Sequence, residues 1–210
     1  MCSQNLVDSV PNIGGHGNKG HVSESLLQHF KSLGCKSLID IGCGAGHNVA
    51  LAREKYGYDA YGIEGDPDVF HNPLSANIFK HDFEQDGKFV SNDVPEKIDL
   101  AWSVSVSEHI AEDKVDYYLE AFNRAKYVVF TWCPKWYDGH HHVNCQDAPY
   151  WIGKFKHIGF RLDDALTDFV KMKSDLVMIK SPYWRNKSFN QKKISKMYLK
   201  QWGLCFYKYC

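Results

Sequence analysis

Short apolar runs alternate with helix-compatible stretches along most of the chain. The run Lys36–Ile41 ends at a glycine-rich turn, and the stretch His47–Tyr56 that follows it is compatible with a helix. Further strand-like runs occupy residues 59–63, 77–80, 98–104 and 126–132. Residues 111–123 carry apolar side chains at helical spacing. Such alternation predicts a parallel sheet with helices on both faces.

The two ends of the chain follow this pattern less closely. A first helix is expected over residues 23–33, and a later one over 149–158, with Gly159 as its C-terminal cap. Residues 169–173 and 176–181 predict a closing hairpin. The tail from Pro182 mixes aromatic residues with lysines and receives no assignment.

Length and composition indicate one globular domain. The chain has 210 residues, of which 44% are hydrophobic and 24% charged. It has no apolar run of about 18–20 residues, which is the length that crosses a bilayer, and no signal-peptide profile at its start. Its seven cysteines are scattered, without a Cys-x-x-Cys pair, which favours free thiols. A soluble protein of the cytoplasm, without membrane contact, is expected.

Charge is balanced overall but uneven along the chain. Lys plus Arg and Asp plus Glu each total 25, so no global field favours nucleic acid. Residues 59–120 contain 15 acidic and 4 basic residues, whereas residues 176–210 contain 8 basic and no acidic ones. Two oppositely charged solvated faces explain this distribution, and a basic docking surface is the alternative.

The glycine turn is the first candidate site. Gly42, Gly44 and Gly46 stand at alternate positions between a strand and a helix, where a helix N-terminus can hold a nucleotide-like ligand. Glu64 ends the next strand, where a carboxylate can accept both hydroxyls of a ribose. The glycine spacing differs from that of dinucleotide folds, and the Gly-Lys-Ser/Thr ending of a P-loop is missing. An adenosine-type cofactor other than nicotinamide or ATP is therefore indicated.

The motif Leu38–Gly46 resembles the first motif of class I S-adenosylmethionine-dependent methyltransferases, in the group of small methyltransferase domains. The resemblance covers about residues 37–110 and continues through Gly62–Asp66, Asp82-Phe83 and the segment Asp99–Ile110 with its Glu-His-Ile. It implies a Rossmann-like three-layer α/β sandwich, with a seven-strand, mostly parallel sheet and an antiparallel closing strand. The expected division is a lid and first helix over residues 1–36, the methyltransferase domain over 37–182 and a basic aromatic tail over 183–210, packed on the same domain.

The resemblance also implies roles for individual residues. Asp40 and the turn, Cys43 included, would hold the methionine part of S-adenosylmethionine, and Glu64 the ribose. Asp82 and Phe83 would contact the adenine, with Gly65 beside it, while Ser103 and Val104 would lie beneath the sulfonium. His109 would be structural or adjacent to the cofactor.

A histidine-rich loop after the fifth strand is the candidate acceptor site. Ligands of such folds bind at the carboxyl edge of the sheet, where this loop should lie. A hydroxyl acceptor must lose its proton, so His141 or His142 is the candidate general base. The alternative is that the loop only ties itself to neighbouring backbone. The other expected acceptor contacts are His16, Lys19, Trp132, Trp136, Tyr137, His140 and Asn144.

These residues predict O-methyl transfer to a small molecule or sugar, with no metal. Cys133, Cys145 or Asp138 could complete a metal site with a histidine, but their spacing does not support zinc. An RNA or protein methyltransferase that uses the basic tail is the alternative among enzymes. A cofactor-binding subunit without activity and a metal-dependent hydrolase remain open, and the oligomeric state is not predicted.

Overall fold

The computed structural model describes residues 20–71, 73–137, 139, 141–179 and 196–209. The larger of its two sheets has seven strands in the order β4-β3-β2-β5-β6-β9-β7. Strands β2 to β6 run parallel, and β9 pairs antiparallel with both β6 and β7. The strands are β2 (Ser37–Ile41), β3 (Asp59–Glu64), β4 (Ile78–Lys80), β5 (Ile98–Ser103), β6 (Ala125–Thr131), β7 (Phe160–Leu162) and β9 (Gly203–Lys208).

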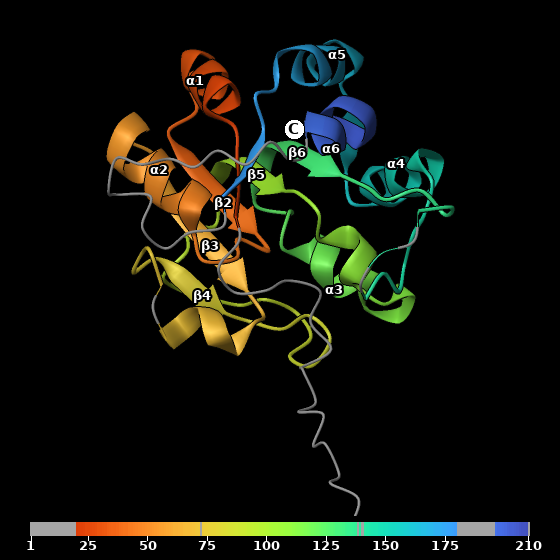
Figure 1. The fold of residues 1–210 in the computed structure, drawn as a ribbon, viewed down its shortest axis with the longest axis horizontal. Coiled ribbons are helices and arrows are strands. Elements are labelled where there is room, and N and C mark those ends of the chain that lie inside the picture. Colours follow the sequence, from red (N-terminus) through yellow and green to blue (C-terminus); the bar gives the residue numbers. More distant parts are fainter. Residues whose placement is uncertain (1–19, 72, 138, 140, 180–195, 210) are drawn as a thin grey trace, which may run out of the picture.

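Helices cover both faces of this sheet (Figure 1). The α-helices are α1 (Glu24–Ser32), α2 (His47–Tyr56), α3 (Val115–Glu120), α4 (Ala148–His157), α5 (Asp164–Lys173) and α6 (Lys196–Trp202). Three short 3₁₀ helices are η1 (Pro67–His71), η2 (Ser107–His109) and η3 (Glu112–Lys114). No helix in the described ranges is long and apolar enough to cross a membrane.

Two apolar clusters explain why the helices lie where they do. Alternate strand residues point to opposite faces, so Ile39 and Val128 join one cluster while Leu38 and Val129 join the other. The first cluster takes its helical side chains from α3 and α4, and the second takes them from α1, α2, α5 and α6. The predicted three-layer, mostly parallel sandwich is confirmed.

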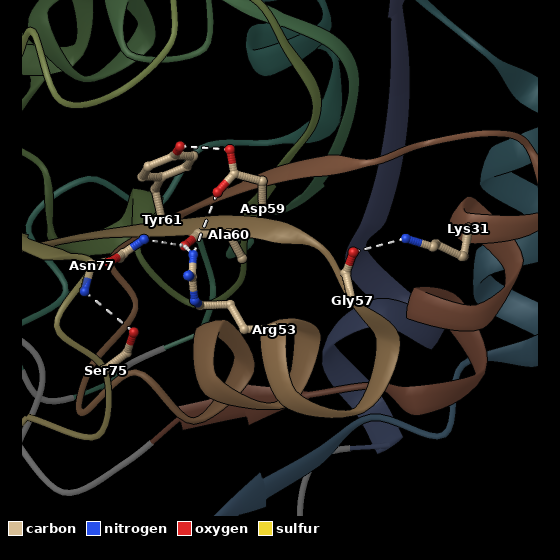
Figure 2. A network of polar contacts seen from close by, with 8 residues as sticks. All are labelled: Lys31, Arg53, Gly57, Asp59, Ala60, Tyr61, Ser75 and Asn77. Carbon is tan, nitrogen blue, oxygen red and sulfur yellow. Dashed lines mark hydrogen bonds and ion pairs between the residues drawn. The ribbon is translucent and has the colours of Figure 1, made fainter.

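A polar network fastens α2 to the outer half of the sheet (Figure 2). The Arg53 guanidinium donates to the main-chain oxygen of Ala60 at 3.2 Å and pairs with Asp59 at 3.4 Å. The Tyr61 hydroxyl donates to Asp59 at 2.7 Å. Because the ion pair is exposed, it orients α2 more than it stabilises the fold.

The predicted hairpin over residues 169–173 and 176–181 is wrong. Residues 164–173 form α5, because Leu166 and Val170 are buried at helical spacing and the Asp163 carboxylate accepts the Leu166 N–H as an N-cap. Strand β8 (Val177–Ile179) instead pairs antiparallel with β1 (Gly20–Val22), in a separate two-stranded sheet. The antiparallel strand of the main sheet is β9, which lies in the unassigned tail.

Candidate functional site

The glycine turn lies between β2 and α2, at the carboxyl edge of the sheet. Gly42, Gly44 and Gly46 have φ angles of 76°, 54° and 83°, a region that side chains rarely adopt. The N–H groups of Gly42 and Cys43 both donate to the main-chain oxygen of Ile63, at 2.8 and 3.0 Å. The end of β3 thus holds the turn, and the glycines keep its backbone accessible to a ligand.

Two buried carboxyl groups face this turn. Glu64, at the end of β3, accepts the N–H groups of Gly44 at 2.7 Å and of Asp66 at 2.9 Å. Burial raises the pKa of Glu64. Burial also raises the pKa of Asp40 to about 8, and the nearby Glu64 charge acts in the same direction. Both groups therefore resist ionisation while nothing positive lies beside them.

No ion pair within the described residues involves Asp40 or Glu64. Because an opposite charge would favour their ionised forms, a cationic ligand would bind here with a favourable electrostatic energy. Main-chain N–H groups and acidic side chains together suit a ligand that carries hydroxyl and positively charged groups.

The other predicted cofactor residues fall into two groups. Gly65 and Asp82 lie together, since a Cβ built on Gly65 would be 3.3 Å from the Asp82 Cα. The Asp82 carboxylate accepts the Glu84 N–H at 2.9 Å and so caps its own turn. The side chains of Cys43, Phe83 and Val104 belong to the apolar clusters. Because these three side chains pack in the clusters, the residues can contact a ligand through their main-chain atoms.

Ser103 connects the glycine turn to the end of β5. Its hydroxyl donates to the main-chain oxygen of Ile41 at 2.8 Å and lies 2.7 Å from the Tyr118 hydroxyl. Three residues later, Val106 packs so closely on Gly42 that a Cβ there would be 2.3 Å from a Val106 methyl group. The segment after β5 therefore borders the glycine turn directly.

A second polar group follows β5 and centres on Glu108, which is 1% exposed. Its carboxylate accepts the Ser105 hydroxyl at 2.8 Å, and its main-chain oxygen accepts the N–H groups of Val143 and Asn144 at 2.9 and 3.1 Å. Ser105 and His141 have φ angles of 59° and 55°. Strained backbone of this kind often accompanies functional sites. Glu108 thus holds the histidine loop against η2.

His109 has a defined protonation pattern. Its Nδ1 lies 3.0 Å from the main-chain oxygen of His141, which can only accept a hydrogen bond, so Nδ1 carries the proton. Burial lowers the pKa of His109. The neutral ring therefore presents Nε2 as a proton acceptor at neutral pH.

His142 faces two thiols. Its Nδ1 lies 3.5 Å from the Cys133 sulfur and 3.6 Å from the Cys145 sulfur. The ring packs over Gly139, where a Cβ would come within 2.3 Å of it. Gly139 and the two cysteines therefore pack around the imidazole ring of His142.

The predicted acceptor residues are only partly brought together. The Tyr137 ring lies 5.8 Å from that of His142, whereas Trp136 is 76% exposed and lies by Tyr137 and Trp202. Trp132 packs on an apolar cluster, and Asn144 is buried with its main chain bound to Glu108. His16, Lys19 and His140 lie outside the described residues.

Glu108 and Tyr198 join this site without having been predicted as site residues, and His21, in the predicted lid, lies beside Tyr198. Glu108 has a sequence signal, since it directly precedes His109 in the Glu-His-Ile segment. The ring of Tyr198, on α6, lies 5.8 Å from that of His21, on β1. Burial raises the pKa of Tyr198 to about 12, and Glu108 also contributes to this rise. Nothing local in the sequence indicates that β1 and α6 meet at this place.

Strand order, the glycine turn and the acidic residue at the end of β3 together are typical of the class I S-adenosylmethionine-dependent methyltransferase fold, and the chain has this fold. No protein-family profile matches the chain. A probable chloroplastic tocopherol O-methyltransferase of Oryza sativa subsp. japonica is 33% identical over 107 residues, which cover 47% of this chain and 29% of that protein. The chain thus matches less than a third of that relative's length.

Solved structures agree on the fold. A TehB-like S-adenosylmethionine-dependent methyltransferase from Corynebacterium glutamicum is 16% identical, with a TM-score of 0.51 and 87% of each chain covered. The sugar N-methyltransferase KedS8 from a Streptoalloteichus species is 16% identical, with a TM-score of 0.51, 66% of this chain and 76% of that chain covered. The small RNA methyltransferase HEN1 is 14% identical, with a TM-score of 0.52, 67% of this chain and 22% of that chain covered.

Proposed function

We propose that this chain is an S-adenosylmethionine-dependent methyltransferase that binds its cofactor at the glycine turn. The observation that carries the proposal is the pair of buried carboxyl groups, Asp40 and Glu64, beside a turn of three glycines with positive φ. The fold and the tocopherol O-methyltransferase relative support it. When bound, S-adenosylmethionine supplies a methyl group on a positively charged sulfur, which an acceptor lone pair can displace in line.

The chain's residues fit the charge and shape of this cofactor. Glu64 lies where a carboxylate can accept ribose hydroxyls, in place of its bond to the Gly44 N–H. Asp40 would ionise beside the positive groups of the cofactor, because a nearby cation offsets its burial. Asp82, next to Gly65, is the candidate for the adenine side.

We propose a hydroxyl of a small molecule or sugar as the acceptor. Support comes from the polar residues after β5, which adjoin the glycine turn through Val106, and from the aromatic rings of Tyr137 and Tyr198 nearby. Among the relatives, one is named for O-methylation of tocopherol and one for N-methylation of a sugar. RNA is the second candidate, because the basic residues of 176–210 coincide with a structural likeness to a small RNA methyltransferase.

The proposed general base is a histidine of this site. The loop residues His141 and His142 remain candidates, but His109 has the best-defined acceptor nitrogen. Its hydrogen bond to the His141 oxygen orients the ring and leaves Nε2 for the acceptor proton. Catalysis would then consist mainly of holding the acceptor oxygen about 3–3.5 Å from the methyl carbon, with its proton directed at a histidine.

The test is methyl transfer from labelled S-adenosylmethionine to a panel of sugars, phenols, short RNAs and peptides. Product mass should reveal a methylated hydroxyl with the wild-type chain, and Glu64→Ala should lose the activity while the exposed-site control Glu54→Ala keeps it. A folded chain that binds the cofactor but labels no acceptor would identify a subunit without activity. Labelling of RNA alone would replace the small-molecule proposal.

A further inference from the structure

Cys133, His142 and Cys145 form a cluster of ligand-type atoms outside the glycine turn. Cys133 follows the end of β6, His142 lies in the histidine loop and Cys145 precedes α4. Their ligand atoms all lie within 4.8 Å of one another. The residues are 9 and 3 positions apart in the sequence (133 to 142 and 142 to 145). This spacing does not resemble a zinc motif, and the fold is what brings the two cysteines to the same histidine.

We propose that this cluster is a binding site for a zinc ion or another thiol-seeking divalent metal. Tetrahedral zinc has Zn–S and Zn–N bonds of about 2.3 and 2.0–2.1 Å, which places a bound sulfur and nitrogen about 3.5 Å apart. The two sulfur-to-Nδ1 distances are 3.5 and 3.6 Å. Both sulfur-to-nitrogen distances thus already match those of tetrahedral coordination.

A carboxylate near the cluster favours the binding of a cation. A carboxylate oxygen of the buried Glu108 lies within 4.8 Å of a ring nitrogen of His142. Glu108 takes part in none of the ion pairs found in the described segments. Both thiols also donate weakly to the Tyr137 main-chain oxygen. On binding, each thiol releases its proton to solvent and its sulfur bonds to the metal.

The site would join three segments and leave one position open. Three protein ligands leave a fourth position of the tetrahedron for water or an acceptor oxygen. Cys133 is buried, whereas His142 and Cys145 are half-buried, so solvent reaches part of the group. The metal would fix the histidine loop beside Glu108 and His109.

Cobalt(II) titration of the metal-free full-length chain tests this inference without any activity measurement. The expected result is one equivalent bound, with a thiolate-to-cobalt charge-transfer band and tetrahedral d–d bands, and displacement by zinc. The double variant C133S/C145S should lose the band, and His142→Ala should weaken binding. Cys35→Ala and His157→Ala are matched controls that should leave the spectrum unchanged.

A second measurement needs no substitution. Zinc should slow the alkylation of Cys133 and Cys145 in the wild-type chain, as read by peptide mass, and leave the cysteines outside the cluster unaffected. The proposal is overturned by binding below one equivalent, by a cobalt spectrum without the thiolate band, or by unchanged binding in the double variant. The last outcome would point to oxygen and nitrogen ligands such as Glu108 and His109, and none of these outcomes bears on cofactor binding.

Discussion

At the scale of single residues, a few buried titratable groups make the stability of the chain depend on pH. Asp40 has a folded-state pKa of about 8, against an ordinary value of 3.8. The folded chain therefore keeps a proton that the unfolded chain releases between these two values. The free energy of unfolding of the cofactor-free chain should fall as pH rises from about 4 to about 8 through this residue.

Asp40→Asn removes this dependence. Relative to the wild type, the variant should gain stability in urea unfolding as the pH rises from 5 to 8, both without cofactor. It should also bind S-adenosylmethionine more weakly, since the favourable charge is lost. Asp168→Asn, at an exposed site on α5, is the control. A difference from the wild type that stays constant between these pH values would contradict the raised pKa.

His109→Asn tests the proposed base. Turnover should fall by roughly 10²–10⁴-fold, the range of general-base catalysis, while cofactor affinity stays nearly unchanged. Because burial lowers the pKa of His109, the wild type should keep its activity at pH values somewhat below the ordinary histidine pKa. His157→Asn is the control. If His109→Asn keeps its turnover while His141→Ala or His142→Ala loses it, the base lies in the histidine loop instead.

At the scale of elements, the strand-turn-helix unit was predictable and the histidine site was not. The glycine pattern after Ile41 and the range His47–Tyr56 can be identified in the sequence because both signals are local, and the structure confirms α2. The meeting of Glu108, Cys133 and His142 depends on which strands pair, so no short window contains it. The end of α5 has a strand-like pattern, because apolar and charged residues alternate over residues 170–173, whereas the helical spacing of Leu166 and Val170 shows only in a longer window.

Gly42→Ala tests how tightly the turn is built. The added Cβ would meet Val106 at 2.3 Å at a φ of +76°. Gly87→Ala is the matched control, since its φ is +73° and nothing lies within 4 Å. In both variants an alanine must adopt left-handed backbone, which lowers the free energy of unfolding by about 1 kcal/mol. Gly42→Ala should lose more stability than Gly87→Ala, because the β-branched side chain of Val106 is stiff and cannot easily move away. Equal losses in urea unfolding would show that the turn is looser than described.

Strand β9 is expected to be essential for the sheet. It lies between β6 and β7, and Cys205 and Phe206 are fully buried. Deleting residues 203–210 should abolish cooperative thermal unfolding, because it leaves two strand edges unpaired and opens both apolar clusters. Removing only Tyr209 and Cys210 is the control and should preserve the transition. A cooperative transition in the longer deletion would refute the role given to β9.

At the scale of the whole molecule, parallel strands gather two sites along one edge of the sheet. The glycine turn follows β2, and the histidine site follows β5, which pairs with β2, and β6, which pairs with β5. Val106 contacts Gly42 and belongs to the same segment as Ser105 and Glu108. This arrangement would bring a methyl donor and an acceptor together without any large movement of the fold.

Isothermal calorimetry of the folded chain with S-adenosylmethionine tests the central claim most directly. We expect saturable heat for one site, affinity that increases from pH 6 to pH 8 as Asp40 ionises, and an affinity lower by about 10–100-fold in Glu64→Ala, the loss expected for a hydrogen bond to a charged group. The titration must be done at a pH where a cooperative unfolding transition shows that the chain is folded. Absence of heat there with both S-adenosylmethionine and S-adenosylhomocysteine would contradict cofactor binding at the glycine turn.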